Sequence, residues 1–269
     1  MRSVIPKQLN PFAWLERKAL FAPERSFRGN PDHVGLEYAD IFPVANDGVR
    51  LHGWHMPASA SSESRNAVWL ILHGNGGNIS VRLDQYKAIR DRYGASIIAI
   101  DYRGYGKSEG KPSESGFYAD ALAAYEFLKA TYPENKKIVF GRSMGGAVAS
   151  QLVSVVTPNA LILEASISSM PEIVRERAPW THYSPARFMV RSKFETTSHV
   201  ASNSVPKLIL HGDADQTVSY QHSERIFAAA TDPKQLEIIP NGDHDGLDLV
   251  DPERYHTVVS EFLREHDAL

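Results

Sequence analysis

The stretch KKIVFGRSMGGAVASQL, residues 136–152, indicates the fold of this chain. Its apolar run IVF is typical of a buried strand, and the small residues after Met144 predict a helix. Ser143 stands where the strand turns into the helix, between Gly141 and Gly145. So tight a turn needs glycines, because side chains there would collide with neighbouring backbone, and it lifts the serine hydroxyl clear of the sheet. The stretch therefore predicts a strand–turn–helix unit that presents a serine nucleophile.

The composition is that of a globular protein with a large core. The chain has 269 residues, of which 42% are hydrophobic and 23% charged, and its net charge of −3 gives no reason to expect a nucleic-acid partner. It has no cysteine, which excludes a disulfide framework and a thiolate nucleophile. The first residues lack the apolar core of a signal peptide, and no apolar run is long enough to cross a bilayer. We expect a cytoplasmic protein.

Short apolar runs alternate with helical patterns along most of the chain. Residues 37–44 and 48–56 flank an Asn-Asp-Gly turn and predict an antiparallel hairpin. Further strands are predicted at residues 67–72, 96–100, 137–140, 160–164, 207–210 and 235–239. Helices are predicted near residues 80–92, 115–131, 144–156, 219–230 and 252–266. This alternation predicts an α/β fold with a mostly parallel eight-stranded sheet flanked by helices.

The domain boundaries follow from the same pattern. We expect an N-terminal segment over residues 1–34 and one α/β domain over residues 35–269. The N-terminal segment has the pattern of an amphipathic helix, and we expect it to pack on its own domain rather than on a membrane surface. Residues 165–205 separate two strands by far more than a crossover helix needs, so they are expected to form a lid.

Two short helices are expected in the lid, over residues 170–178 and 186–194. The lid is rich in apolar side chains, and we expect some of them to roof a pocket for an apolar acyl chain. Trp180 and Phe188 are the lid residues that we predict to bind substrate.

Polar residues that could assist Ser143 follow other strands. In an open α/β sheet such groups gather at the carboxyl ends of the strands. His244 follows the last predicted strand and is expected to act as the base, because imidazole can take and return a proton near pH 7. An acid must hold the tautomer of that base. Asp215 is favoured for this part, while Asp213 and Glu164 also follow strands and stay open as alternatives.

A tetrahedral oxyanion would need hydrogen-bond donors. The N–H of Met144, at the start of the predicted helix, and the N–H of Asn75, in the loop HGNGGN, are the expected donors. The loop DYRGYGKSEG, residues 101–110, lacks the full phosphate-binding pattern and is expected at the rim of the site, where Tyr102 and Tyr105 would touch substrate.

These motifs together resemble those of the α/β-hydrolases. The chain has HGNGG, DYRGYGKSEG, GRSMGG, HGDADQTV and NGDHDG in the order of that family, from about residue 35 to the C-terminus. It is most similar to the branch of abhydrolase-domain serine hydrolases that includes protein depalmitoylases. The resemblance implies Ser143 as nucleophile, Asp215 as acid and His244 as base, with an oxyanion hole formed by Asn75 and Met144.

The sequence thus predicts a serine hydrolase that cleaves carboxylic esters or thioesters of a small-molecule or acylated substrate and needs no metal or organic cofactor. An amidase or peptidase with the same triad is an alternative. A metal-dependent hydrolase is another, with ligands from His211, Asp213, Asp215 and residues 243–245. A non-catalytic binding module is the third.

Overall fold

The computed structural model describes residues 11–59, 66–177 and 191–269 of the chain. Its centre is an eight-stranded sheet in the order β10-β9-β8-β7-β4-β6-β3-β2. All neighbouring pairs are parallel except those that β3 makes with β2 and β6. The predicted mostly parallel eight-stranded α/β sheet is therefore confirmed.

Each strand of the sheet coincides with a predicted apolar run. The strands are β2 (Ala39–Ile41), β3 (His52–Met56), β4 (Ala67–Leu72), β6 (Ser96–Asp101), β7 (Lys136–Arg142), β8 (Ala160–Glu164), β9 (Lys207–Gly212) and β10 (Lys234–Ile239). Two very short strands, β1 (Ala22–Pro23) and β5 (Gly76–Gly77), pair in parallel as a separate two-stranded sheet.

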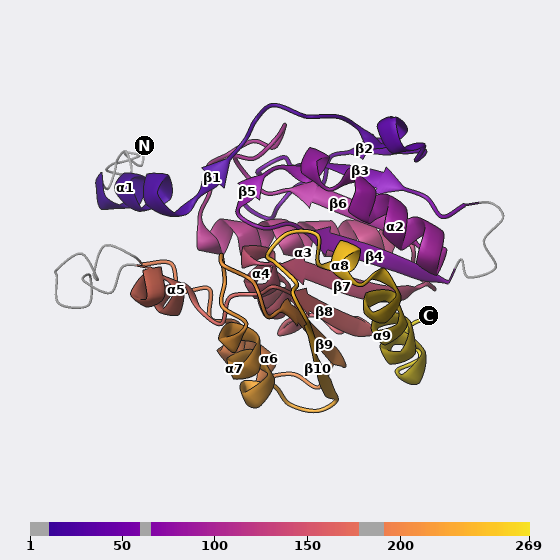
Figure 1. Cartoon of the computed structure of the whole chain (residues 1–269). Coiled ribbons are helices and arrows are strands. Elements are labelled where there is room, and N and C mark those ends of the chain that lie inside the picture. Colours follow the sequence, from indigo (N-terminus) through magenta and orange to yellow (C-terminus); the bar gives the residue numbers. More distant parts are fainter. Residues whose placement is uncertain (1–10, 60–65, 178–190) are drawn as a thin grey trace.

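Helices cover both faces of the eight-stranded sheet (Figure 1). The helices on one face are α3 (Glu114–Thr131), α4 (Met144–Val153), α6 (Thr196–Val200) and α7 (Gln221–Ala229). Those on the other are α2 (Leu83–Tyr93), α8 (Leu247–Val250) and α9 (Pro252–Glu265). Short 3₁₀ turns lie at Pro31–Val34 and Ile79–Val81. The two remaining helices, α1 (Pro11–Leu20) and α5 (Met170–Arg177), lie at one edge of the molecule.

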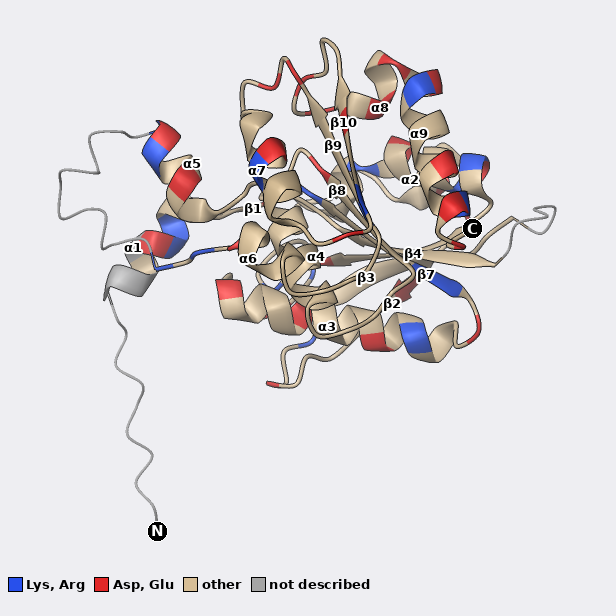
Figure 2. Ribbon diagram, turned by 90° about the horizontal axis from the view of Figure 1, so that it is seen from below, with Lys and Arg blue, Asp and Glu red and all other residues tan. Residues whose placement is uncertain are grey.

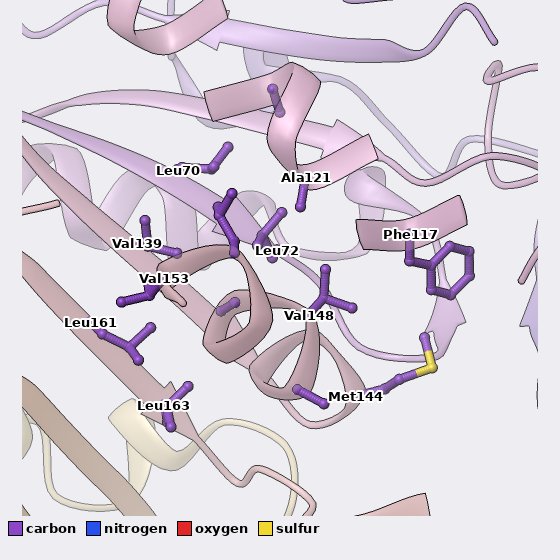
Figure 3. Close-up of a cluster of buried hydrophobic side chains, with 14 of the residues drawn as sticks. Leu70, Leu72, Phe117, Ala121, Val139, Met144, Val148, Val153, Leu161 and Leu163 are labelled. Carbon is purple, nitrogen blue, oxygen red and sulfur yellow. The ribbon is translucent and has the colours of Figure 1, made fainter. Parts of the chain in front are cut away.

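Burial on both faces explains the apolar character of the strands. Every residue of β4, β6 and β8 is buried, as a parallel sheet between two helical layers requires. Figure 3 shows side chains from β4, β7 and β8 converging on α4, with Val153 near Val139 and Leu161, and Val148 near Leu72. This packing holds α4 over the middle of the sheet.

The expected lid is only partly described. Its first expected helix, residues 170–178, is α5. Of the second, residues 186–190 lie outside the described residues and residues 191–194 are not helical, so the helix expected there is wrong at its C-terminal end. The next helix is α6, which starts at Thr196. Among the described residues, no helix is both long and apolar enough to cross a membrane.

Leu70→Ala is predicted to destabilise the fold by about 2–5 kcal/mol, because Leu70 is 0% exposed in β4 and its loss leaves a cavity beneath α4. Urea unfolding followed by circular dichroism measures the change. Val155→Ala, at a side chain that is 60% exposed, is the control and should change stability by less than about 0.5 kcal/mol. Equal effects of the two substitutions would contradict the packing described here.

Candidate active site

Ser143 forms the turn between β7 and α4 with an unusual backbone. Its φ of 55° and ψ of −123° lie in a region that residues other than glycine seldom adopt. The Ser143 N–H donates to the carbonyl of Glu164 at 2.9 Å, and its own carbonyl accepts from the N–H of Gly146 at 3.0 Å. These two bonds hold the strained turn in place.

The glycines after Ser143 permit α4 to approach the sheet closely. A Cβ atom on Gly145 would overlap the carbonyl oxygen of Leu72 at the end of β4. A Cβ atom on Gly146 would overlap the hydroxyl of Ser166. The first turn of α4 therefore rests on backbone and small side chains, and only glycine fits at these two positions.

His244 and Asp215 form a directly bonded pair at this edge of the sheet. His244 Nδ1 lies 2.7 Å from Asp215 Oδ2, in loops that follow β10 and β9. Because the carboxylate only accepts, Nδ1 carries a proton, and the tautomer with this proton has its lone pair on Nε2. This is the tautomer that a general base needs.

Asp215 is held by three further donors. Oδ1 accepts from the N–H groups of Thr217 at 2.7 Å and Val218 at 2.8 Å, and Oδ2 also lies 3.1 Å from Nε2 of buried His211. Burial acts to raise the pKa of Asp215, but the hydrogen bonds from His211, His244 and Val218 outweigh it and keep that pKa below its ordinary value of 3.8. Asp215 is thus held as a carboxylate beside the imidazole.

The two alternative acids are occupied elsewhere. Asp213 Oδ1 accepts from the N–H of Asn241 at 2.6 Å and so braces its own loop. Glu164 lies 3.1 Å from Nε of Arg142 and accepts from the hydroxyl of Tyr255 at 2.6 Å. Burial raises the pKa of Glu164, against the opposing effect of Arg142. Neither acid contacts the ring of His244 in the described part of the chain.

Arg142 contacts the loop of His244, and the sequence reasoning assigned it no part. It precedes Ser143, is buried, and donates through Nη2 to the carbonyl of His244 and to Asp245 Oδ1, the latter at 2.6 Å. Arg142 therefore joins the strand that leads to the serine to the loop that holds the histidine. A charged residue two positions after the apolar run IVF, directly before the serine, was the signal that could have revealed it.

Ser143 and His244 lie in adjoining loops but are not joined by a hydrogen bond. Within the residues that the structure describes, none connects Ser143 Oγ to His244 Nε2, and such bonds are often long before substrate binds. Gly74 abuts the serine, since a Cβ atom there would lie 3.3 Å from Ser143 Cβ. This places the loop of Asn75 beside the nucleophile. Met144 is the first residue of α4, so its N–H has no acceptor within the helix.

The side chain of Asn75 points away from the serine, into the N-terminal segment. Its Nδ2 donates to the carbonyl of Leu20 at 2.7 Å, and its Oδ1 accepts from the N–H of Ala22 at 3.2 Å. The hydroxyl of Tyr105 donates to the same oxygen at 2.9 Å. Sequence reasoning gave no sign of this connection, because Asn75 and Leu20 are 55 positions apart.

Tyr102 and Tyr105 do not reach the open part of the site. Both are fully buried, and the hydroxyl of Tyr102 donates to the carbonyl of His73 at 3.1 Å. In this structure the two side chains support the loop of Asn75, and their expected contact with substrate stays a prediction. Trp180 and Phe188, expected to bind substrate from the lid, lie outside the described residues.

A cavity of about 320 Å³ opens over Ser143. Among the described residues, its lining is mainly apolar with one cationic side chain, and comes from α1, α4, α5 and the loops after β4, β8 and β9. The described lining residues are Ala19, Leu20, Asn75, Ser143, Met144, Ile167, Met170, Ile173, Val174, Arg177, Thr217 and Val218. The site can therefore accommodate an apolar group directly at the serine hydroxyl.

The side chains of the metal hypothesis do not gather into a ligand set. In the three described ranges no group of three or more His, Asp or Glu side chains is arranged to hold a metal ion. His211 instead bonds Ser223 Oγ through Nδ1 at 2.6 Å and Asp215 through Nε2. Asp243 accepts from the N–H of His244 at 2.7 Å.

Comparison with known proteins identifies the family of the chain. The family model described as serine aminopeptidase, S33, matches residues 63–198. The uncharacterized protein Rv2307c of Mycobacterium tuberculosis is 33% identical over 261 residues, which is 96% of this chain and 91% of that protein. The alpha/beta hydrolase domain-containing protein WAV2 of Arabidopsis thaliana is 30% identical over 93% of this chain and 88% of its own.

Among solved structures, the esterase Pf2001 of Pyrococcus furiosus has a similar fold, with a TM-score of 0.76 over 91% of this chain and 98% of the esterase. Its sequence is 21% identical, so the similarity concerns the fold. The chain belongs to the α/β-hydrolase superfamily of serine hydrolases, in the family described as serine aminopeptidase, S33.

The hydrogen bonds to Asp215 predict a particular dependence of stability on pH. Because the folded state lowers the pKa of Asp215, its ionised form stabilises the fold above about pH 4, and this contribution is lost as the pH falls through the lowered pKa. Asp215→Asn should therefore be less stable than the wild type at pH 7, and the gap should narrow towards pH 3. Urea unfolding from pH 7 to pH 3 measures it.

The control for this measurement is Glu261→Gln, at an exposed carboxylate of α9. Its stability should follow that of the wild type across the whole range. A constant gap between Asp215→Asn and the wild type would show that the ionised carboxylate contributes nothing specific.

Proposed function

We propose that the protein hydrolyses carboxylic esters or thioesters with an apolar acyl group, through Ser143, His244 and Asp215 and a covalent acyl-enzyme. The observation that carries the proposal is the apolar cavity of about 320 Å³ that has Ser143 in its lining. Thr217 and Val218 line the same cavity and donate their N–H groups to Asp215, the partner of His244. Such a cavity suits an acyl chain, while the serine hydroxyl faces the carbonyl at its end.

The proposed reaction begins with proton transfer. His244 Nε2 takes the proton of Ser143 Oγ as Oγ bonds to the carbonyl carbon, and Asp215 stabilises the imidazolium that forms. The carbonyl oxygen becomes an oxyanion, which the N–H groups of Met144 and Asn75 would bind. Each such donor is typically worth about 3–4 kcal/mol in the barrier.

Collapse of the tetrahedral intermediate breaks the bond to the leaving group. The imidazolium of His244 gives its proton to the departing alcohol or thiol, and the acyl group stays on Ser143. Water then enters, loses a proton to His244 and attacks the acyl carbon, and a second collapse returns the proton to Ser143 and releases the acid. Thioesters are included because the chain resembles the branch that contains depalmitoylases.

The cavity lining argues against the aminopeptidase activity in the family description. Recognition of a free α-amino group needs an anionic partner near the scissile bond. No carboxylate lies among the described residues that line the cavity, and its charged member is the cation Arg177. We therefore favour an uncharged acyl group over an N-terminal amino acid.

Ser143→Ala is predicted to abolish labelling by a fluorophosphonate, because the probe needs an activated serine oxygen. Intact mass spectrometry should find one adduct on the wild type and none on the variant. Ser154→Ala, which changes an exposed serine at the other end of α4, should keep the adduct. An adduct on folded Ser143→Ala, or none on the folded wild type, would overturn the proposed nucleophile.

The apolar cavity predicts that activity rises with acyl length. Each methylene that leaves water contributes about 0.8 kcal/mol, which corresponds to about fourfold in kcat/KM. With p-nitrophenyl esters from two to twelve carbons, kcat/KM should increase until the cavity is full and then level off. A steady fall from two carbons onward would contradict an acyl pocket, and faster cleavage of aminoacyl p-nitroanilides would favour the aminopeptidase instead.

A further inference from the structure

The last turn of α1 forms part of the cavity wall. Ala19 and Leu20 line the same cavity as Ser143, opposite lining residues that belong to α5. Figure 1 and Figure 2 show α1 and α5 side by side at one edge of the molecule, with charged residues of both signs on each. The N-terminal segment thus reaches the site from outside residues 63–198, the part of the chain that the family model matches.

This wall is fastened to the loop beside the nucleophile. The carbonyl of Leu20 accepts from Asn75 Nδ2 at 2.7 Å, and the N–H of Ala22 donates to Asn75 Oδ1 at 3.2 Å. The two bonds use both polar atoms of one amide side chain, so they fix the orientation of Asn75 as well as the position of the wall.

Backbone pairing continues the connection. β1 pairs with β5, with Ala22 opposite Gly76 and Pro23 opposite Gly77, directly after Asn75 in the loop. Phe21, between Leu20 and Ala22 in the sequence, is buried, and its ring centroid lies 5.2 Å from that of Phe117. Residues 20–23 and 75–77 therefore form one rigid unit.

A second contact joins α1 to residues 191 and 192 of the lid segment. Glu16 Oε1 accepts from the N–H groups of Arg191 and Ser192, each at 2.6 Å. The carboxylate of Glu16 holds α1 at its middle, and Asn75 holds it at its end. Together these contacts fix the position of Ala19 at the cavity.

We propose that the end of α1, at Ala19 and Leu20, determines the length of acyl chain that the enzyme accepts. The proposal rests on the proposed function, since it concerns the pocket of that same reaction. Ala19 is the small residue of the wall and is exposed, so a larger side chain there can enter the cavity without displacing the core. The cavity is then shortened while Ser143 and its neighbours stay in place.

Ala19→Phe is the test. With p-nitrophenyl esters, kcat/KM for an eight-carbon or longer chain should fall by at least about tenfold, the effect of excluding roughly two methylenes at about fourfold each. Hydrolysis of the two-carbon ester should stay within about twofold of the wild type, and the fluorophosphonate adduct should persist. Lys18→Phe places the same ring on an adjacent exposed residue that does not line the cavity, and it should leave the profile unchanged.

A second variant tests the same inference if Ala19→Phe does not fold. Leu20→Ala keeps the backbone carbonyl that Asn75 binds but enlarges the cavity, so the preferred chain should become longer. If both variants are folded, are labelled and hydrolyse the two-carbon ester, their catalytic serine works. An unchanged dependence of kcat/KM on acyl length in both would then overturn the inference. A wild type without adduct or ester hydrolysis would instead refute the proposed function itself.

Discussion

The carbonyl oxygen of Leu72 lies so close to Gly145 that no side chain fits between them, and this contact brings the first turn of α4 down onto the centre of the sheet. It is possible only with glycine at this position. The approach forces Ser143 into its positive-φ conformation, which leaves the hydroxyl at the carboxyl end of β7, between β4 and β8. The remaining parts of the site are arranged around that fixed point.

The elements around the serine fall into two groups with different physical origins. Asp215 and His244 follow β9 and β10, so the order of the sheet brings them to the same edge. The cavity wall comes from α1 and α5, which lie outside the sheet and are held by side-chain bonds such as those of Glu16 and Asn75. Chemistry and selectivity can therefore change independently in such a fold.

This division also explains how far the sequence could be interpreted. Strand positions follow from local apolar runs such as AVWLIL at β4, because burial on both faces constrains every residue. Local patterns favour Asp215 but leave Glu164 open, since both follow strands. The bond from His244 to Asp215 and the contacts of Glu164 with Arg142 and Tyr255 separate them. The burial of Tyr102 and Tyr105, and the bond from Asn75 to Leu20, depend on partners distant in the chain.

Arg142 has a consequence for the motions of the site. Its guanidinium bonds the carbonyl of His244 and pairs with Glu164, which in turn accepts from Tyr255 of α9. The loop after β10 cannot open locally without breaking the bonds that this buried guanidinium donates to it, and leaving a buried donor unpaired is costly. The imidazole is thus held in place from the end of β7 as well as by Asp215, although its loop is near the surface.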